Sequence, residues 1–373
     1  MRMLQRGLCL LLLLPLFCVA GFAQQMNDTA IEQSGIYESV ALLDEQTQSF
    51  LKEIGFTQIS AESIYNMSFS RFLQSLFSAF RLALRENLKS LLSVFGVVFL
   101  ACFADAMGSG KAGKKEEIFG ILAAVLLCLS TIPTLSSLMA QASSVIESAG
   151  VFSLSAIPVL CMVTAAQGKT VSAAVCSGSA VGVSQLLNTL FSTFFMPLNH
   201  ILAGVGIAAA LESSFRLEKV IALVRKYLLI LLSAAAVVYC TVLSVRTQIG
   251  GAVDQTTLKT VKFASSHFVP VIGNAISDAA VAVSSSLSLT KSTIGIFGML
   301  SVGGLFVPLL IKILLWMAGL ELAAVIGAAF ELEAIQKMLH NLAAVLSVLI
   351  IIVLFALLLF FINFGVLLQL KSS

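Results

Sequence analysis

Polar side chains gather in one segment of a chain that is otherwise strongly apolar. Residues 262–287 carry His267, Asn274, Asp278 and Ser285, and at about 100° per residue the last three fall within about 20° of His267 on a helical wheel. A carboxylate that faces lipid costs about 3 kcal/mol, so we expect Asp278 to face a wet cavity, a bundle interior or the membrane–water interface. The segment can therefore line a path for an ion or solute, lie as a surface helix at the bilayer boundary, or form a polar seam between helices.

Two residues interrupt this polar face, and a lone cation lies further along the chain. Pro270 lacks a backbone donor and Gly273 is a weak helix former, so the pair is predicted to end or kink a helix. Lys312 stands in the middle of the apolar run VPLLIKILLWMAGLEL. It either serves as counter-charge for Asp278 or Glu321, or extends its ammonium to the cytoplasmic edge of the bilayer. We favour the second interpretation, because the run is long enough to tilt.

The sequence shows no arrangement of residues that is typical of an enzyme or a metal site. The stretch ADAMGSGKAGKK looks like a phosphate-binding loop, but Asp105 stands where the loop needs glycine and Ala112 where it needs serine or threonine. His200, His267 and His340 are far apart and lack partners at metal-ligand spacing. Neither a Gly-x-Ser-x-Gly turn nor a Ser–Lys pair is recognisable. The protein is therefore predicted not to be an enzyme and to need neither a cofactor nor a metal.

Composition sets the class of protein in which these residues must work. Of the 373 residues, 58% are hydrophobic and 11% are charged, whereas soluble domains are about a quarter charged. A water-soluble core could not cover so much apolar surface, so the chain is predicted to be an integral membrane protein. A formal net charge of +3 is too small to indicate a nucleic-acid partner, and the partner expected from composition is the lipid bilayer.

Three parts are expected along the chain. A positive start, the apolar run LCLLLLPLFCV and small residues before position 24 predict a signal peptide over 1–23. Residues 24–90 form an extracytoplasmic polar segment that ends in an amphipathic helix over 69–89. This helix either lies on the membrane surface or docks a partner, or it packs against its own bundle. Residues 91–370 form the transmembrane domain.

The transmembrane domain is predicted to be an all-α bundle of about seven to nine spans. Apolar runs suited to spans cover 91–107, 118–139, 151–166, 171–196, 197–211, 224–245, 294–320 and 342–370. Several are shorter than the roughly 20 residues of a straight span, or contain a proline, namely Pro133, Pro158, Pro197 or Pro308. Broken helices are therefore expected, and for 151–166 and 197–211 a re-entrant or tilted piece is the alternative to a full span.

At the polar segment the sequence resembles the stage III sporulation protein AE family of endospore-forming bacteria. The residues that carry the resemblance are VKFASSHFVPVIGNAISDAA, preceded by RTQIGGAVDQTTLKT and followed by LTKSTIGIFGML. They contain an aromatic-Val-Pro-Val-Ile-Gly core, a Ser-Asp pair, a lysine and a glycine-rich span. The layout is similar too, with a signal, a modest extracytoplasmic region and a multi-span membrane domain.

The resemblance implies a membrane subunit of the sporulation-specific channel or secretion apparatus that links mother cell and forespore and is required for late forespore development. Such a protein would lie in the mother-cell membrane that surrounds the forespore. Its implied partners are other membrane and ring-forming proteins of that apparatus, possibly with a secretion-ATPase-like protein. Two alternatives stay open: a self-sufficient permease with a polar path near Asn274 and Asp278, and a membrane scaffold that transports nothing.

Overall fold

The computed structural model describes residues 43, 45–54, 69–108, 114–211, 219–220, 223–241, 245, 273–330 and 332–368; for 273–287 it describes the backbone alone. The elements are α4 (Glu45–Ile54), α6 (Phe69–Gly108), α7 (Lys114–Ala166), α8 (Thr170–Leu190), the π-helical turn η1 (Phe191–Phe195), α9 (Met196–Leu211), α11 (Gly273–Ala329) and α12 (Glu333–Leu368). A further helix covers Leu223–Thr241. No strand occurs in the described residues, and the predicted all-α class is confirmed.

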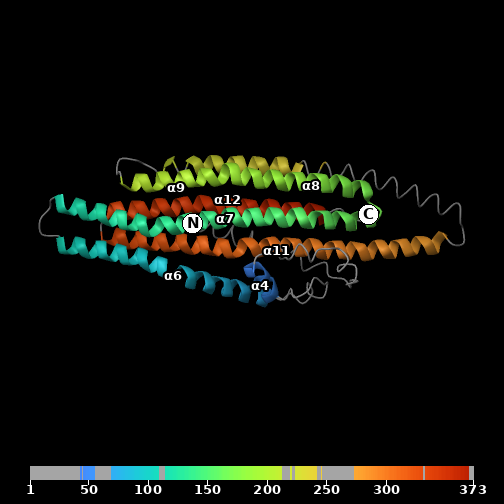
Figure 1. Cartoon of the computed structure of the whole chain (residues 1–373), viewed down its shortest axis with the longest axis horizontal. Helices are drawn as coiled ribbons and strands as arrows, with labels where there is room; N and C mark the ends of the chain where they lie inside the picture. The colour runs from blue at the N-terminus through green and yellow to red at the C-terminus, as the bar shows by residue number, and fades with distance from the viewer. Residues whose placement is uncertain are drawn as a thin grey trace.

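The long helices lie side by side in one elongated bundle (Figure 1). Helices α11 and α12 make the most extensive contact, and α7 packs against both of them. On one side α6 contacts α7 and α11, and on the other side α8 and α9 contact α7 and α12. The short helix α4 lies against α6 and α11. The centre of the protein is therefore the group α7, α11 and α12, which the other helices flank.

A tight turn reverses the chain between α7 and α8. Gly168 has a φ of 83°, in the left-handed region that glycine adopts without strain. Its N–H donates to the carbonyl of Ala165 at 2.9 Å, which closes the end of α7. Helix α8 can then begin at Thr170 and run back along α7.

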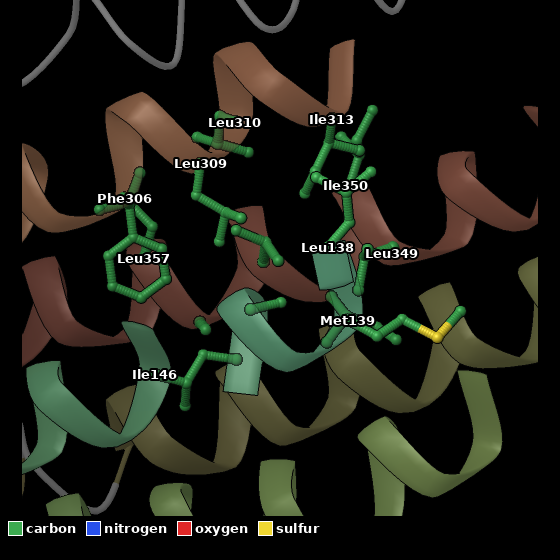
Figure 2. Packing of buried hydrophobic residues seen from close by; sticks show 14 of the residues in the cluster. Leu138, Met139, Ile146, Phe306, Leu309, Leu310, Ile313, Leu349, Ile350 and Leu357 are labelled. Atoms are coloured by element: carbon green, nitrogen blue, oxygen red, sulfur yellow. The ribbon is translucent and has the colours of Figure 1, made fainter. Parts of the chain in front are cut away.

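The interior where α7, α11 and α12 meet is filled by apolar side chains (Figure 2). Buried residues that share this space include Leu138, Ile146, Phe306, Leu309, Ile313, Leu349, Ile350 and Leu357. Glycines bring the backbones of α11 and α12 close, because Gly298 faces the ring of Phe364 and Gly295 faces Leu368. In lipid, such close packing replaces the hydrophobic effect as the main force between helices.

The prolines lie inside long helices, which differs from the expected broken spans. Pro133 and Pro158 lie inside α7, and Pro308 lies inside α11. The runs 118–139 and 151–166 are therefore parts of one helix, so the interpretation of 151–166 as a re-entrant or separate piece is wrong. Neighbouring helices can satisfy the backbone groups that a proline leaves unpaired, and this is why sequence alone overestimates its effect in a bundle.

A π-helical turn keeps the chain helical at Pro197. In an α-helix the ring of Pro197 would clash with the carbonyl four residues earlier. In η1 the N–H of Met196 instead bonds to the carbonyl of Phe191, which adds one residue to the turn just before the proline. The runs 171–196 and 197–211 consequently form one continuous helical rod from α8 to α9, and 197–211 is not a re-entrant piece.

Six of the described helices are long and apolar enough to cross a membrane. They are Ser70–Ala104, Leu122–Ala166, Thr170–Val205, Leu223–Thr241, Thr290–Ala329 and Glu333–Gly365. The eight apolar runs of the sequence correspond to six helices in the described residues because two pairs of runs are merged into continuous helices. The predicted signal peptide over 1–23 lies outside the described residues.

Helix α6 joins the predicted amphipathic helix to the first apolar run without interruption, so the boundary predicted at residue 90 falls inside one helix. It contacts the bundle through a narrow face that includes Phe72, Ser75, Ala83 and Leu91, all of which are buried. Most of the expected apolar stripe points outward instead, namely Leu73, Phe77, Phe80, Leu84 and Leu88. The helix therefore packs on its own bundle, but only through part of the apolar stripe that its periodicity predicts, with Phe72 buried and most of the stripe exposed.

Candidate functional site

The predicted polar face belongs to the first turns of α11. Gly273 is the first residue of this helix, and the helical register places Asn274, Asp278 and Ser285 along one side of it. The side chains of these residues lie outside the description, as do His267 and Pro270 altogether. A shared polar face and a helix break at Pro270 and Gly273 therefore stay predictions.

This part of α11 extends past the end of α12. Gly295 faces Leu368, the last residue of α12. Asp278 comes about 17 residues before Gly295 and so lies about 25 Å further along the helix axis. Figure 1 shows α11 continuing past the turn between α7 and α8 as well. Asp278 is thus placed on an extension of the bundle and not at its packed centre.

The structure assembles a different polar site around Lys312, which we call the Lys312 cluster: Glu86, Asn87, Gln141, Lys312 and Trp316. The ammonium of Lys312 lies 2.9 Å from Oε2 of Glu86 and donates to Oε1 of Gln141 at 3.4 Å. These contacts connect α11 with α6 and with α7. The side chain of Lys312 is 13% exposed and that of Glu86 is 40% exposed, so the cation is the more buried partner.

A second hydrogen bond of the Lys312 cluster lies one helical turn away. The indole N–H of Trp316 donates to Oδ1 of Asn87 at 2.9 Å, and the amide of Asn87 donates to the carbonyl of Ala83 at 2.7 Å. Trp316 is fully enclosed, so its single donor needs such a partner. The two adjacent residues Glu86 and Asn87 of α6 therefore both bond to α11, which fixes the rotation and height of α6 on the bundle.

The counter-charge of Lys312 is neither of the two carboxylates that sequence reasoning names, and an ammonium that reaches the bilayer edge stays a prediction. Sequence reasoning names Asp278 or Glu321 as its counter-charge, whereas the structure places Glu86 beside it. Glu321 is more than two helical turns further along α11, about 13 Å from Lys312 along the axis. It contacts His340 of α12 instead, with 3.3 Å between Oε1 and Nδ1.

The Lys312 cluster and the Glu321–His340 pair connect neighbouring helices through hydrogen bonds and ion pairs. Among the described residues, no group of three or more histidine, cysteine, aspartate or glutamate side chains could hold a metal ion. The three histidines of the sequence fit this picture as far as they are described. His340 pairs with Glu321, and His200 bonds through Nδ1 to the carbonyl of Met196 in its own helix.

A buried polar pair connects α8 with α12. The amide of Asn363 donates to the hydroxyl of Ser184 at 2.8 Å, and both side chains are fully buried. A polar group that is buried without a partner is costly, so this bond favours one register of the two helices over others. The bond between Ser184 and Asn363 thus fixes the position of α8 on the bundle, as the Lys312 cluster fixes that of α6.

We predict that Ser184→Ala lowers the free energy of unfolding by about 1 kcal/mol, because it leaves the amide of Asn363 buried with no acceptor. The double variant Ser184→Ala/Asn363→Leu should be closer to the wild type than Ser184→Ala alone, since it removes both polar groups. Denaturant titration of the purified chain in mixed micelles measures both. Ser177→Ala is the control, because the Ser177 hydroxyl bonds to the carbonyl of Ala174 within α8. A double variant less stable than Ser184→Ala would contradict the argument.

Sequence reasoning did not single out Glu86, Gln141, Ser184 or Asn363. Asn363 does carry a signal, because it is the one strongly polar side chain in the long apolar run from Ala343 to Leu368. Glu86 carries none, since it stands among the charges of an amphipathic helix and looks like any solvated residue. Which face of α6 meets the bundle decides its role, and that face depends on tertiary contacts.

The described residues are helical and include six helices long and apolar enough to cross a membrane, so the chain is a polytopic membrane protein. Comparison with known families narrows this class. The family described as Stage III sporulation protein AE matches residues 55–370, and the chain therefore belongs to that family.

A curated relative and the solved structures complete the comparison. The chain is 26% identical over 208 residues to Stage III sporulation protein AE of Bacillus subtilis (strain 168), which is 56% of this chain and 51% of the relative. The aligned part thus spans about half the length of that relative. No solved structure matches the chain.

Proposed function

We propose that this chain is a membrane subunit of the sporulation-specific channel or secretion apparatus that links mother cell and forespore, and that late forespore development requires it. The observation that carries the proposal is the family match over residues 55–370. In this role the protein lies in the mother-cell membrane around the forespore and catalyses no reaction of its own. It works with other membrane and ring-forming proteins of the apparatus, including a secretion-ATPase-like protein.

The packing of the bundle favours a subunit over a self-sufficient permease. Where α7, α11 and α12 meet, the space between the helices is filled by buried leucine, isoleucine and phenylalanine side chains (Figure 2). A hydrated path for a polar solute does not fit through that apolar centre. The polar positions Asn274 and Asp278 lie instead on the extension of α11, where helices of another subunit can meet them.

Purification from sporulating cells and reconstitution test the proposal together. After crosslinking at the stage when the forespore is engulfed, the tagged full chain is expected to copurify with ring-forming proteins of the apparatus. In liposomes the chain alone is expected to release no trapped solute. Release of a small solute by the chain alone, with no copurifying ring proteins, would favour the permease and contradict the proposal.

Asp278→Asn is expected to lower the yield of heat-resistant spores at least roughly tenfold, since it removes the one charge of the predicted polar face. The amount of protein in the membrane should stay the same, because Asp278 lies beyond the packed centre of the bundle. Spore counts and immunoblots of the membrane fraction measure the two quantities.

Glu333→Gln is the matched control for Asp278→Asn, because it also changes a carboxylate to an amide. Glu333 is 78% exposed and bonds to Lys337 one turn further along α12. Its substitution should leave spore yield unchanged. Normal spore yield with Asp278→Asn would show that the polar face has no part in the function.

A further inference from the structure

The outward face of α6 combines apolar and cationic side chains in two adjoining rows. The exposed apolar residues Leu73, Phe77, Phe80, Leu84 and Leu88 make up one row. Arg81, Arg85 and Lys89, all exposed, make up the other, at a spacing of four residues. On a helical wheel of about 100° per residue the two rows are neighbours. We call the three cations the cationic row.

The cationic row lacks negative partners within the described part of the chain. Neither Arg81, Arg85 nor Lys89 forms an ion pair there, and like charges four residues apart on a helix repel each other. The two acidic side chains close to this part of α6 are engaged elsewhere. Glu86 pairs with Lys312, and Glu53 accepts hydrogen bonds from Ser75 at 3.2 Å and Ser78 at 2.6 Å. Among the described residues, no anion is paired with the cationic row.

A shallow groove of about 610 Å³ runs beside the start of this row. Its walls combine the polar side chains Gln74, Ser78, Arg81 and Arg85 with the apolar side chains Leu73 and Phe77. The guanidinium of Arg81 lies over the ring of Phe77, 5.4 Å from the ring centre, so cation and apolar surface are in direct contact. Such a groove suits a ligand that is anionic at one end and apolar at the other.

The chain that follows the cationic row indicates where this face lies. Residues 90–104 contain no charged side chain, and within them Leu92, Phe99, Leu100 and Phe103 are exposed. These apolar residues belong to the first helix that can cross the membrane. The cationic row directly precedes them, where the headgroups of the bilayer begin, and long basic side chains are favoured at that level.

We propose that the outward face of α6 binds anionic phospholipid. Arg81, Arg85 and Lys89 would hold the phosphate groups, and the exposed Leu92, Phe99 and Phe103, which follow on the same side of the helix, would contact the acyl chains. Guanidinium groups bind phosphate oxygens in a bidentate way. They should bind a zwitterionic headgroup more weakly, because the headgroup's own cation competes for the same phosphate. A soluble anion or a nucleic acid would make no contact with the exposed apolar side chains that follow the cationic row in α6. This inference does not depend on the proposed role in sporulation.

Lipid retention by the purified full chain tests the proposal. The chain is exchanged into a neutral detergent and mixed with phosphatidylglycerol or phosphatidylcholine of the same acyl chains, and native mass spectrometry counts the lipids that stay bound. Each surface cation strengthens binding to anionic lipid roughly fivefold, so the cationic row predicts a preference on the order of 100-fold at low salt. The preference should fall as salt is raised.

The variant Arg81→Gln/Arg85→Gln/Lys89→Gln is expected to lose most of this preference. The control Lys52→Gln/Arg71→Gln/Lys337→Gln, which removes three exposed charges outside the cationic row, should keep it. Thermal unfolding without lipid checks that both variants are folded. Equal retention of the two lipids by the wild type, or equal loss in both variants, would overturn the proposal. The proposal would also be overturned if inorganic phosphate bound the wild type as well as phosphatidylglycerol does. It would be overturned too if the Arg81→Gln/Arg85→Gln/Lys89→Gln variant changed only the self-association of the chain.

Discussion

Glu86→Leu is expected to lower the free energy of unfolding by about 2 kcal/mol, because it strips a largely buried ammonium of its charged partner. Lys312 would keep only the weak contact to the amide oxygen of Gln141 at 3.4 Å. Lys312→Met should have a smaller effect, about 1 kcal/mol, since the carboxylate of Glu86 is more exposed and water can solvate it. The chain has a single tryptophan, and Trp316 lies in the Lys312 cluster, so its fluorescence reports unfolding there directly.

The double variant Glu86→Leu/Lys312→Met should lose less stability than the sum of the two single variants, because no unpaired charge remains. Lys337→Met is the matched control. Lys337 pairs with Glu333 at 2.9 Å, the same distance as Lys312 with Glu86, but both partners are mostly exposed. Its effect should stay below about 0.5 kcal/mol. Strictly additive losses in the double variant would show that the ion pair does not couple α6 to α11.

Gly298→Ala is expected to destabilise the protein by about 2 kcal/mol, although alanine is intrinsically the better helix former. The added Cβ would lie 2.5 Å from Cε1 and 2.7 Å from Cδ1 of Phe364. That ring is fully buried, and it also packs against Phe152 with 6.1 Å between the ring centres, so it has little room to move. The methyl group would therefore push α11 and α12 apart. Denaturant titration in mixed micelles measures the change.

Gly303→Ala is the control in the same helix, because its Cβ would meet Phe361 at an ordinary contact distance of 3.5 Å. Here the helix preference of alanine should prevail, with a gain of roughly 0.5–1 kcal/mol. The double variant Gly298→Ala/Phe364→Leu should recover part of the loss, because the shorter side chain makes room. Equal effects of the two alanine variants would contradict the close approach at Gly298.

The class of fold follows from composition and from the length of the apolar runs, but the division into helices does not. Runs such as 342–370 are so apolar that a membrane helix is the only physical solution, and α12 confirms it. Whether Pro133 or Pro158 interrupts a helix depends on neighbours that compensate for the missing hydrogen bond. A single sequence does not specify those neighbours. The sequence therefore predicts two separate pieces where the structure has the one helix α7.

For the candidate site, local pattern finds residues but not their partners. The sequence marks Lys312 as exceptional because it is a charge in an apolar run. Its partner Glu86 is more than 200 residues away in the chain and looks unexceptional there. Only the parallel packing of α6 on α11 brings the two within 2.9 Å. For the polar face around Asp278 the sequence pattern is clear, but the side chains that surround it lie outside the described residues.

The length of α11 has a consequence for how far the protein reaches. With 57 residues at about 1.5 Å each, the rod is about 85 Å long, while the oily layer of a bilayer is about 30 Å thick. Tilting cannot absorb the difference, because the axis would have to lean about 70° from the normal, against a usual value of about 20°. An upright rod leaves about 55 Å of its length to be shared between the two sides. The end of α11 can therefore present residues for contact with another protein well outside the bilayer, without a separate soluble domain.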